Sequence, residues 1–247
     1  MIKFKNALYT IIGLGLFILI WEIIALTTNQ KFLPEFFVCL YNMVLLFGKS
    51  RTWLSIGSTL LKLIISLAIS SVFGIIIGLL AGYFDFIKKI VAPIITVLKA
   101  FPTVALVLLL VVFVKHFYIY VVAIVCFPII YQAAVEGSEK SFKRFEDELR
   151  ISGSAFVNIT RVVFPLSLPY YAMGFLQAFA LGLKVQVMAE ILSYQAGDYG
   201  LGNLIYSGYT NVEYHQMMSY VLMTITLALL IDLGLYFLSE KIKEKAA

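Results

Sequence analysis

Residues 146–169 read EDELRISGSAFVNITRVVFPLSLP, and they form the longest polar interruption in an otherwise apolar chain. Three acidic residues open the stretch, the small residues Ser152-Gly153-Ser154 follow, and two prolines close it. Small residues permit a tight turn, and proline cannot continue a helix. The pattern therefore predicts two short helices, at about 142–152 and 155–163, lying across one face of the molecule. Such helices could bind a soluble partner, and a purely structural loop would explain the pattern equally well.

The composition of the chain indicates a membrane protein. Of its 247 residues, 62% are hydrophobic and 13% are charged, and the mean hydropathy is +0.96. Since a soluble domain carries roughly 25% charged residues, this chain has too few of them to cover a surface that faces water. We therefore expect an all-α, polytopic membrane protein surrounded by lipid. The net charge of +5 does not indicate a nucleic-acid partner, because the basic residues are spread among loops that flank apolar runs.

Six apolar runs predict six transmembrane helices within a single domain, residues 1–247. Each run approaches or exceeds the ~20 residues that a helix needs to cross the hydrocarbon. Prolines inside the runs are tolerable, because neighbouring helices can satisfy the backbone groups that proline leaves unpaired. The polar segment, at about 142–164, separates the fourth run from the fifth. The predicted spans are approximately 7–27, 55–83, 91–114, 118–135, 170–192 and 217–238.

The placement of lysine and arginine predicts the orientation. If the N-terminus lies inside, twelve of these residues fall on the inner side of the membrane and four on the outer side. Cytoplasmic loops of membrane proteins carry the excess of positive charge. We therefore expect a multi-pass protein of the cell membrane whose two termini and 142–164 segment are cytoplasmic.

The second apolar run contains a regular stripe of small residues. Ser66, Ser70, Gly74, Gly78 and Gly82 follow one another at a spacing of four, which places them on one face of a helix. Small residues at such positions let a second helix approach closely. The stripe therefore predicts a helix-packing face, and the partner helix could belong to the same subunit or to another one.

Catalysis and bound cofactors find no support in the sequence. The two histidines, His116 and His215, are far apart, and no H-E-x-x-H motif is present, so we expect no metal site. Gly48-Lys49-Ser50 does not complete a phosphate-binding loop, because such a loop needs glycine where Met43 stands. We therefore expect a chain that is not an enzyme and that does not itself bind ATP.

The polar segment resembles the permease subunits of ABC importers. Their motif has an acidic residue, two small residues, a glycine six positions after the acid, then a hydrophobic position and Leu-Pro at a fixed distance. In a gapless alignment Glu146 is the acid, Ser152 replaces the glycine and Pro165 closes the motif. In the alternative, Asp147 and Gly153 match, but the distance to the proline is one residue short.

We prefer the gapless alignment, because Ser154, Phe156 and Pro169 then also fall on family positions. Neither alignment has the usual pair of alanines, so the residue that faces the partner stays open between them. The resemblance implies that ATPase subunits bind this segment as coupling helices. The residues implied in this coupling are Glu146, Asp147, Arg150, Ser152, Gly153, Ser154, Phe156 and Pro165.

Further motifs extend the resemblance over nearly the whole chain. They are similar to landmarks of the nitrate/sulfonate/taurine branch of these permeases, a branch that also includes permeases for vitamins and vitamin precursors. The motifs are Trp21-Glu22, Leu33-Pro34, the glycine run at 74–82, Ala92-Pro93, Ala100-Phe101-Pro102, Phe127-Pro128, Met188-Ala189-Glu190 and Gly200-Leu201-Gly202.

The resemblance implies a type I ABC importer permease. Two copies of the chain would form a homodimer around one pathway, two ATPase subunits would carry ATP and Mg, and an extracytoplasmic binding protein would deliver the solute. The solute would be a sulfonate- or nitrate-like anion, or a vitamin or pyrimidine precursor. The alternative is a six-span secondary transporter or channel without an ATPase partner, which predicts an inverted repeat that the sequence does not show.

Charged and polar residues inside apolar runs are candidates for the solute pathway. A lysine at the bilayer centre costs roughly 2.5–3.5 kcal/mol, so Lys184, which shares a run with Gln177 and Glu190, could bind an anion. It could equally extend its ammonium to the membrane surface or pair with Glu190, although a separation of six residues suits a helical pair poorly. Phe101 and Tyr194 are candidates for contact with a planar solute.

Overall fold

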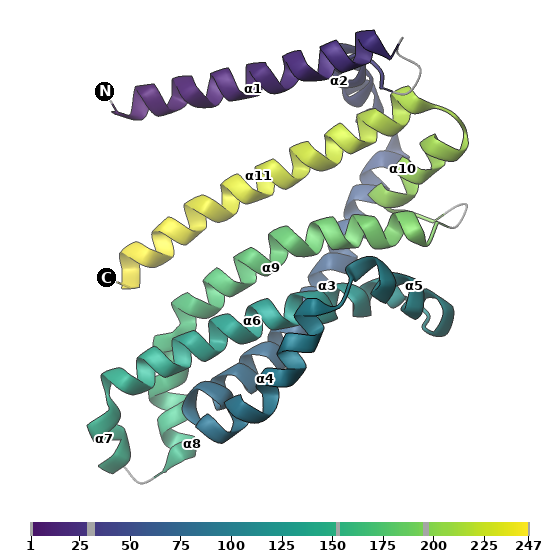
Figure 1. Ribbon diagram of the computed structural model, residues 1–247. Helices are drawn as coiled ribbons and strands as arrows, with labels where there is room; N and C mark the ends of the chain where they lie inside the picture. The colour runs from purple at the N-terminus through teal and green to yellow at the C-terminus, as the bar shows by residue number, and fades with distance from the viewer. Residues whose placement is uncertain (1, 29–32, 152–153, 195–197, 247) are drawn as a thin grey trace. The chain divides into compact units, whose positions relative to one another are not determined.

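The structure is a computed structural model that describes residues 2–28, 33–151, 154–194 and 198–246. The described residues form helices and no strand, as the all-α prediction requires (Figure 1). A π-helical turn, Ile159–Val163, connects α8 (Ala155–Asn158) to α9 (Phe164–Leu192). The α-helices are α1 (Ile2–Thr27), α2 (Phe36–Leu46), α3 (Ser50–Tyr83), α4 (Asp85–Ala100), α5 (Thr103–Phe113), α6 (Phe117–Arg144), α7 (Glu146–Ile151), α8 (Ala155–Asn158), α9 (Phe164–Leu192), α10 (Leu201–Thr210) and α11 (Tyr214–Ala246).

Four stretches of helix are long and apolar enough to cross a membrane, namely α3, α6, Ala155–Leu192 and the Tyr214–Phe237 part of α11. The bent pair α4–α5 makes a fifth if it is counted as one span. The first predicted span falls in α1, where the stretch Ile12–Thr27 is apolar but too short to be counted by itself. Five of the six predicted spans thus coincide with described helices of sufficient length or with the bent pair.

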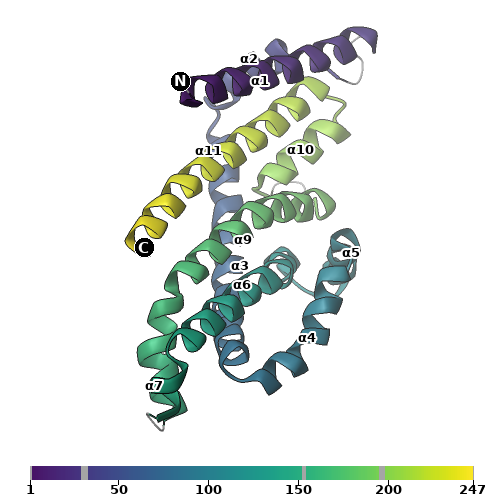
Figure 2. The ribbon, with the colours of Figure 1, turned by 60° about the vertical axis from the view of Figure 1, so that its left-hand side comes forward.

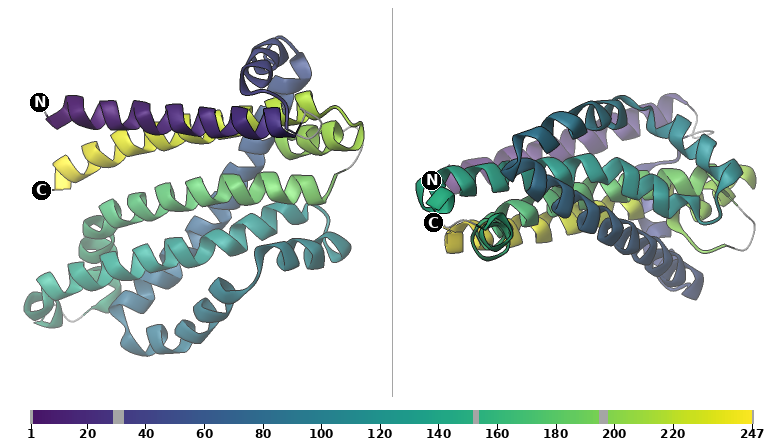
Figure 3. Two further views of the ribbon diagram at one scale, coloured as in Figure 1. Left: turned by 45° about the horizontal axis from the view of Figure 1, so that its top comes forward. Right: turned by 90° about the horizontal axis from the view of Figure 1, so that it is seen from below.

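The predicted third span, 91–114, is not one straight helix. α4 ends at Ala100, α5 begins at Thr103, and the two helices are bent by 93° (Figure 3). Phe101 and Pro102 between them have extended backbone, with ψ of 124° and 120°. Proline disfavours the helical conformation in the residue before it and lacks an N–H of its own. The Phe101-Pro102 pair therefore breaks this span.

The prediction that Pro165 and Pro169 end the second short helix is wrong. Helix continues from Ala155 to Leu192 without a gap, with Pro165 in the first turn of α9 and Pro169 inside it. The π turn explains how Pro165 is accommodated, because the N–H of Phe164 bonds to the carbonyl of Ile159, one residue further back than in an α-helix. The missing N–H of Pro165 then falls in the widened turn.

The chain divides into two compact units, and α3 and α11 contribute residues to both. One unit comprises Met1–Ile56 and Tyr194–Leu227. Within it, the indole N–H of Trp21 donates to the Pro34 carbonyl at 2.9 Å, and the Ser219 hydroxyl donates to the Cys39 carbonyl at 3.0 Å. These bonds connect α1 and α11 to the segment that contains α2.

The other unit comprises Gly57–Ser193 and Ala228–Ala247, and α6 and α9 form its centre. These two helices lie side by side along much of their length (Figure 2). Glycine lets them approach closely, since a Cβ added at Gly174 would lie 2.3 Å from the Cβ of Ala133. Where α3, α4 and α6 meet, a small apolar cluster is buried, made of Ala81, Ile95, Tyr131 and Val135.

The stripe of small residues on α3 lies against α6 of the same chain. An added Cβ would lie 2.9 Å from Ile130 at Gly74, 2.6 Å from the Cβ of Ala134 at Gly78 and 2.4 Å from the Cβ of Ser138 at Gly82. Further along the stripe, Ser70 is buried, and the buried Ser66 donates its hydroxyl to the Lys62 carbonyl at 2.8 Å. Close packing of α3 on α6 therefore depends on the absence of side chains at three successive turns.

Candidate functional site

The segment between α6 and α9 comprises α7 and α8, and α8 continues through the π turn into α9. α7 and α8 lie together at one end of α6 (Figure 1). Ser152 and Gly153 lie outside the described residues, and the side chain of Arg150 is not described either. The geometry of the segment therefore rests on the residues that flank this turn.

Asn158 holds the two short helices together. Its side chain is only 3% exposed, and its Nδ2 donates to the Leu149 carbonyl at 2.7 Å and to the Tyr83 hydroxyl at 3.4 Å. The Tyr83 ring in turn meets the Phe142 ring edge-on at 4.9 Å. One amide thus joins α7, α8 and the end of α3. Asn158 was not among the residues predicted from the sequence, although its carboxamide stands out between the apolar Val157 and Ile159.

This helix pair exposes large apolar side chains together with polar ones. Ile151 is 86% exposed and Phe156 is 76% exposed, and Val157 is exposed as well. Among the residues predicted for coupling, Asp147, Ser154 and Pro165 are also exposed, and Glu146 is half-buried. Large apolar side chains surrounded by polar ones are typical of a protein-binding surface.

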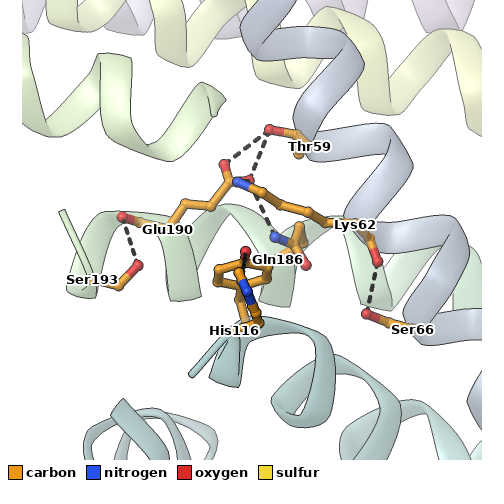
Figure 4. Close-up of polar contacts among 8 residues, drawn as sticks. Thr59, Lys62, Ser66, His116, Gln186, Glu190 and Ser193 are labelled. Carbon is orange, nitrogen blue, oxygen red and sulfur yellow. Dashed lines mark hydrogen bonds and ion pairs between the residues drawn. The ribbon is translucent and has the colours of Figure 1, made fainter. Parts of the chain in front are cut away.

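A second polar site lies between α3 and α9 and is centred on Glu190. The carboxylate is 1% exposed and accepts hydrogen bonds from Thr59 Oγ1 at 3.1 and 2.9 Å and from Gln186 Nε2 at 3.1 Å. Lys62 Nζ lies 3.4 Å from the same carboxylate (Figure 4). The buried charge of Glu190 is therefore both hydrogen-bonded and paired with a cation.

Aromatic side chains continue the Glu190 site towards the start of α6. Lys62 Nζ lies 4.7 Å from the centroid of the Tyr118 ring, and the Tyr118 hydroxyl lies 2.7 Å from His116 Nδ1. Glu190 forms a salt bridge with Lys62, and the suggested pairing of Glu190 with Lys184 is not what the structure shows. Sequence analysis did not single out Thr59 or Lys62, although a lysine inside an apolar run was a signal of the same kind as Lys184.

A third site is a cavity of about 280 Å³ between α6 and α9. Gln177 lies in its wall, but Lys184 and Phe101 are not among the described residues that line it. Tyr194 belongs to the other compact unit, where its ring lies 4.8 Å from that of Tyr206. The lining residues are Ile129, Gln132, Ala133, Glu136, Tyr170, Met173, Gly174 and Gln177.

Gln132, Glu136 and Gln177 line the cavity and are exposed, and Lys184 is exposed further along α9. We call these four residues the polar stripe; the exposed apolar residues Phe175 and Leu181 also belong to this stretch of α9. By contrast, the exposed face of α3 is apolar, with Leu61, Ile64, Ile65, Val72, Phe73 and Ile76. Amide and charged groups are costly against hydrocarbon, and within membrane helices they face water or protein. The composition of the two faces therefore favours lipid at α3 and water or protein at the polar stripe.

No group of three or more His, Cys, Asp or Glu side chains in the described part of the chain is placed to hold a metal ion. Cys39 and Cys126 are both buried free thiols. The chemistry that the three sites offer is thus hydrogen bonding, ion pairing and apolar contact.

Comparison with known proteins agrees with this architecture. Residues 70–244 match the family described as binding-protein-dependent transport system inner membrane component. Two solved structures of inward-facing conformations of the MetNI methionine ABC transporter have similar folds. A chain of the selenomethionine soak form matches with a TM-score of 0.64 at 15% identity, over 78% of this chain and 98% of that one. A chain of the native crystal form matches with a TM-score of 0.59 at 16% identity, over 77% and 96%. No curated protein matches.

The family match covers more than half of the chain, and the structural match covers almost all of the solved chains. At such low identity the structural match establishes the fold, and the family match establishes the relationship. The chain is a member of the binding-protein-dependent transport system inner membrane component family, with the fold of an ABC importer permease.

Proposed function

We propose that two copies of this chain form the membrane pathway of an ABC importer. An extracytoplasmic binding protein delivers a small solute to the outer side of the pathway. Two separate ATPase subunits bind ATP and Mg and contact the 142–164 segment, and closure of the ATPases rocks the membrane helices between inward and outward states. The excess of basic residues on one side supports a cytoplasmic position for both termini and for this segment.

The observation that carries this proposal is the exposed apolar surface of α7 and α8. Ile151 and Phe156 project from a segment that Asn158 fixes to the ends of α3 and α7. A loop that only connected two spans would gain nothing from exposing such side chains beside acidic residues. A soluble partner would bury them, and the buried apolar area would stabilise the complex.

Phe156→Asp should detach the ATPase subunits from an otherwise intact permease. A central aromatic residue of an interface commonly contributes about 2 kcal/mol or more, so retention of the ATPase in a pull-down should fall by roughly 30-fold. The measurement is the ratio of ATPase to permease after affinity purification from membranes. The matched control is Phe86→Asp in α4, because Phe86 is 62% exposed and lies outside the segment. Undiminished co-purification of the Phe156→Asp chain would contradict the proposed docking surface.

Asn158→Leu should also weaken the complex with the ATPase subunits, in this case because the 142–164 segment is held less firmly. The substitution removes the 2.7 Å hydrogen bond from the Asn158 side chain to the buried Leu149 carbonyl, a loss of about 1 kcal/mol or more. We expect a permease that still inserts but whose 142–164 segment is cut faster by protease and retains less ATPase. Thr160→Val is the control, since the exposed Thr160 hydroxyl bonds only to carbonyls of its own helix, Phe156 and Val157. Equal proteolysis of the two variants would show that Asn158 does not fix the segment.

A further inference from the structure

We propose that the cavity between α6 and α9 is a water-accessible solute site that takes uncharged or cationic hydrogen-bonding solutes and disfavours anions. The inference rests on the proposed importer function and names the class of solute that this function leaves open. It is carried by three observations, which are the construction of the cavity, the polarity of the surrounding face and the charge of the lining.

The two helices supply polar groups to the cavity at helical spacings. Gln132 and Glu136 lie one turn apart on α6, and Tyr170 and Gln177 lie two turns apart on α9. The close approach of Gly174 to Ala133 brings the helix backbones together. At about 280 Å³, the cavity is near the lower end of the ~300–1,000 Å³ of small-molecule sites. The size suits a small solute that two carboxamides and a phenol can hydrogen-bond.

In this proposal the polar stripe faces an aqueous pathway, and water therefore reaches the cavity. Gln132, Glu136 and Gln177 are exposed on helices whose length and hydropathy qualify them as membrane spans. Gln132 and Gln177 lie inside the predicted spans 118–135 and 170–192, where a carboxamide facing hydrocarbon would be unfavourable, and Glu136 lies one residue beyond the first of these spans. The apolar exposed face of α3, which includes Ile76, shows what a lipid-facing surface of the same unit looks like.

The charge of the lining distinguishes between classes of solute. Glu136 contributes a carboxylate, and no lysine or arginine is among the described lining residues. Two cations lie nearby. Lys140 Nζ is 2.6 Å from Glu136 Oε1 and 5.0 Å from the centroid of the Tyr170 ring, so Lys140 and Glu136 pair with each other; Glu136 lines the cavity, whereas Lys140 is not among its described lining residues. Lys184 lies seven residues beyond Gln177, about 10 Å along the helix axis. A bound anion would therefore meet the carboxylate of this ion pair before its ammonium, whereas a donor-bearing neutral or cationic solute would find acceptors.

Reaction of an introduced thiol with charged reagents tests the site without knowledge of the natural solute. The chain carrying Gln177→Cys, co-expressed with its ATPase partner in permeabilised membranes, is treated with a cationic trimethylammonium-ethyl methanethiosulfonate or with an anionic sulfonatoethyl methanethiosulfonate. Each rate is divided by the rate of the same reagent with a free thiol. The unaltered chain is the blank, because Cys39 and Cys126 are buried, and Ile76→Cys reports on the lipid-facing surface.

We expect the Gln177→Cys thiol to react much faster than the Ile76→Cys thiol. The normalised rate should be about fivefold higher for the cationic reagent, and adding Glu136→Gln should bring this ratio towards one. A rate no higher than that of Ile76→Cys would show that the cavity is dry. A ratio at or below one, or a ratio unaffected by Glu136→Gln, would show that the cavity does not disfavour anions through Glu136. These readouts do not depend on ATPase retention, so their failure is distinct from failure of the proposed docking surface.

Discussion

Gly78→Leu should abolish accumulation of folded permease. A Cβ at this position would lie 2.6 Å from the Cβ of Ala134 and 2.7 Å from the backbone carbonyl oxygen of Tyr131. Ordinary carbon contacts lie at about 3.5–4.0 Å, so α3 and α6 would have to separate by about 1 Å before the remaining leucine atoms are placed. Overpacking of a close contact costs about 1–3 kcal/mol and sometimes more, and a backbone carbonyl cannot move aside as a side chain does.

Gly57→Leu in the same helix is the matched control. An added Cβ at Gly57 meets nothing within 4 Å, and leucine is a better helix former than glycine by under about 1 kcal/mol. The control chain should therefore accumulate at least as well as the unaltered one. Gly78→Ala should fall between the two, because the gain in helix propensity offsets part of the clash. The measurement is the amount of monodisperse protein after mild detergent extraction, and equal amounts for Gly78→Leu and Gly57→Leu would contradict the packing of α3 on α6.

The positions of the membrane helices could largely be predicted from the sequence, because the hydrophobic requirement of a span depends on composition alone. The breaks within these helices could not be predicted in this way. Pro102 ends one helix, whereas Pro93, Pro128 and Pro169 lie inside helices. What differs is whether the surroundings satisfy the carbonyl groups that a proline leaves unpaired, and those surroundings are set by tertiary packing. The π turn before Pro165 is a local solution of this kind that hydropathy cannot reveal.

The candidate sites were predictable where a residue is conspicuous by itself and not where its partner is distant. Glu190 stands out in an apolar run, but Thr59 and Lys62 are 131 and 128 residues away in the sequence. Helical periodicity carries no information about contacts over such separations. Gly78 is a second example. The four-residue spacing of the small residues indicates a packing face, but only the structure identifies α6 as the helix that lies against it.

Lys62→Met should strongly destabilise the unit that contains α3 and α9. The substitution leaves the buried carboxylate of Glu190 without the ammonium that lies 3.4 Å away. Removal of one partner from a buried ion pair typically costs about 3–5 kcal/mol, because the remaining charge is left uncompensated. The hydrogen bonds from Thr59 and Gln186 would still satisfy the carboxylate oxygens but would supply no net charge. We therefore expect the midpoint of thermal unfolding of the purified permease to fall by about 10 °C.

The double variant Lys62→Met/Glu190→Gln separates the loss of charge compensation from the loss of packing. Glutamine keeps an oxygen that can accept the Thr59 hydrogen bond and removes the buried negative charge, so most of the lost stability should return. Lys184→Met is the matched control, because Lys184 is an exposed lysine of α9 that takes no part in this pair. If Lys62→Met and Lys184→Met unfold at the same temperature, the Glu190 charge is compensated by other groups. If the double variant recovers most of the stability that Lys62→Met loses, the ion pair between Lys62 and Glu190 couples α3 to α9.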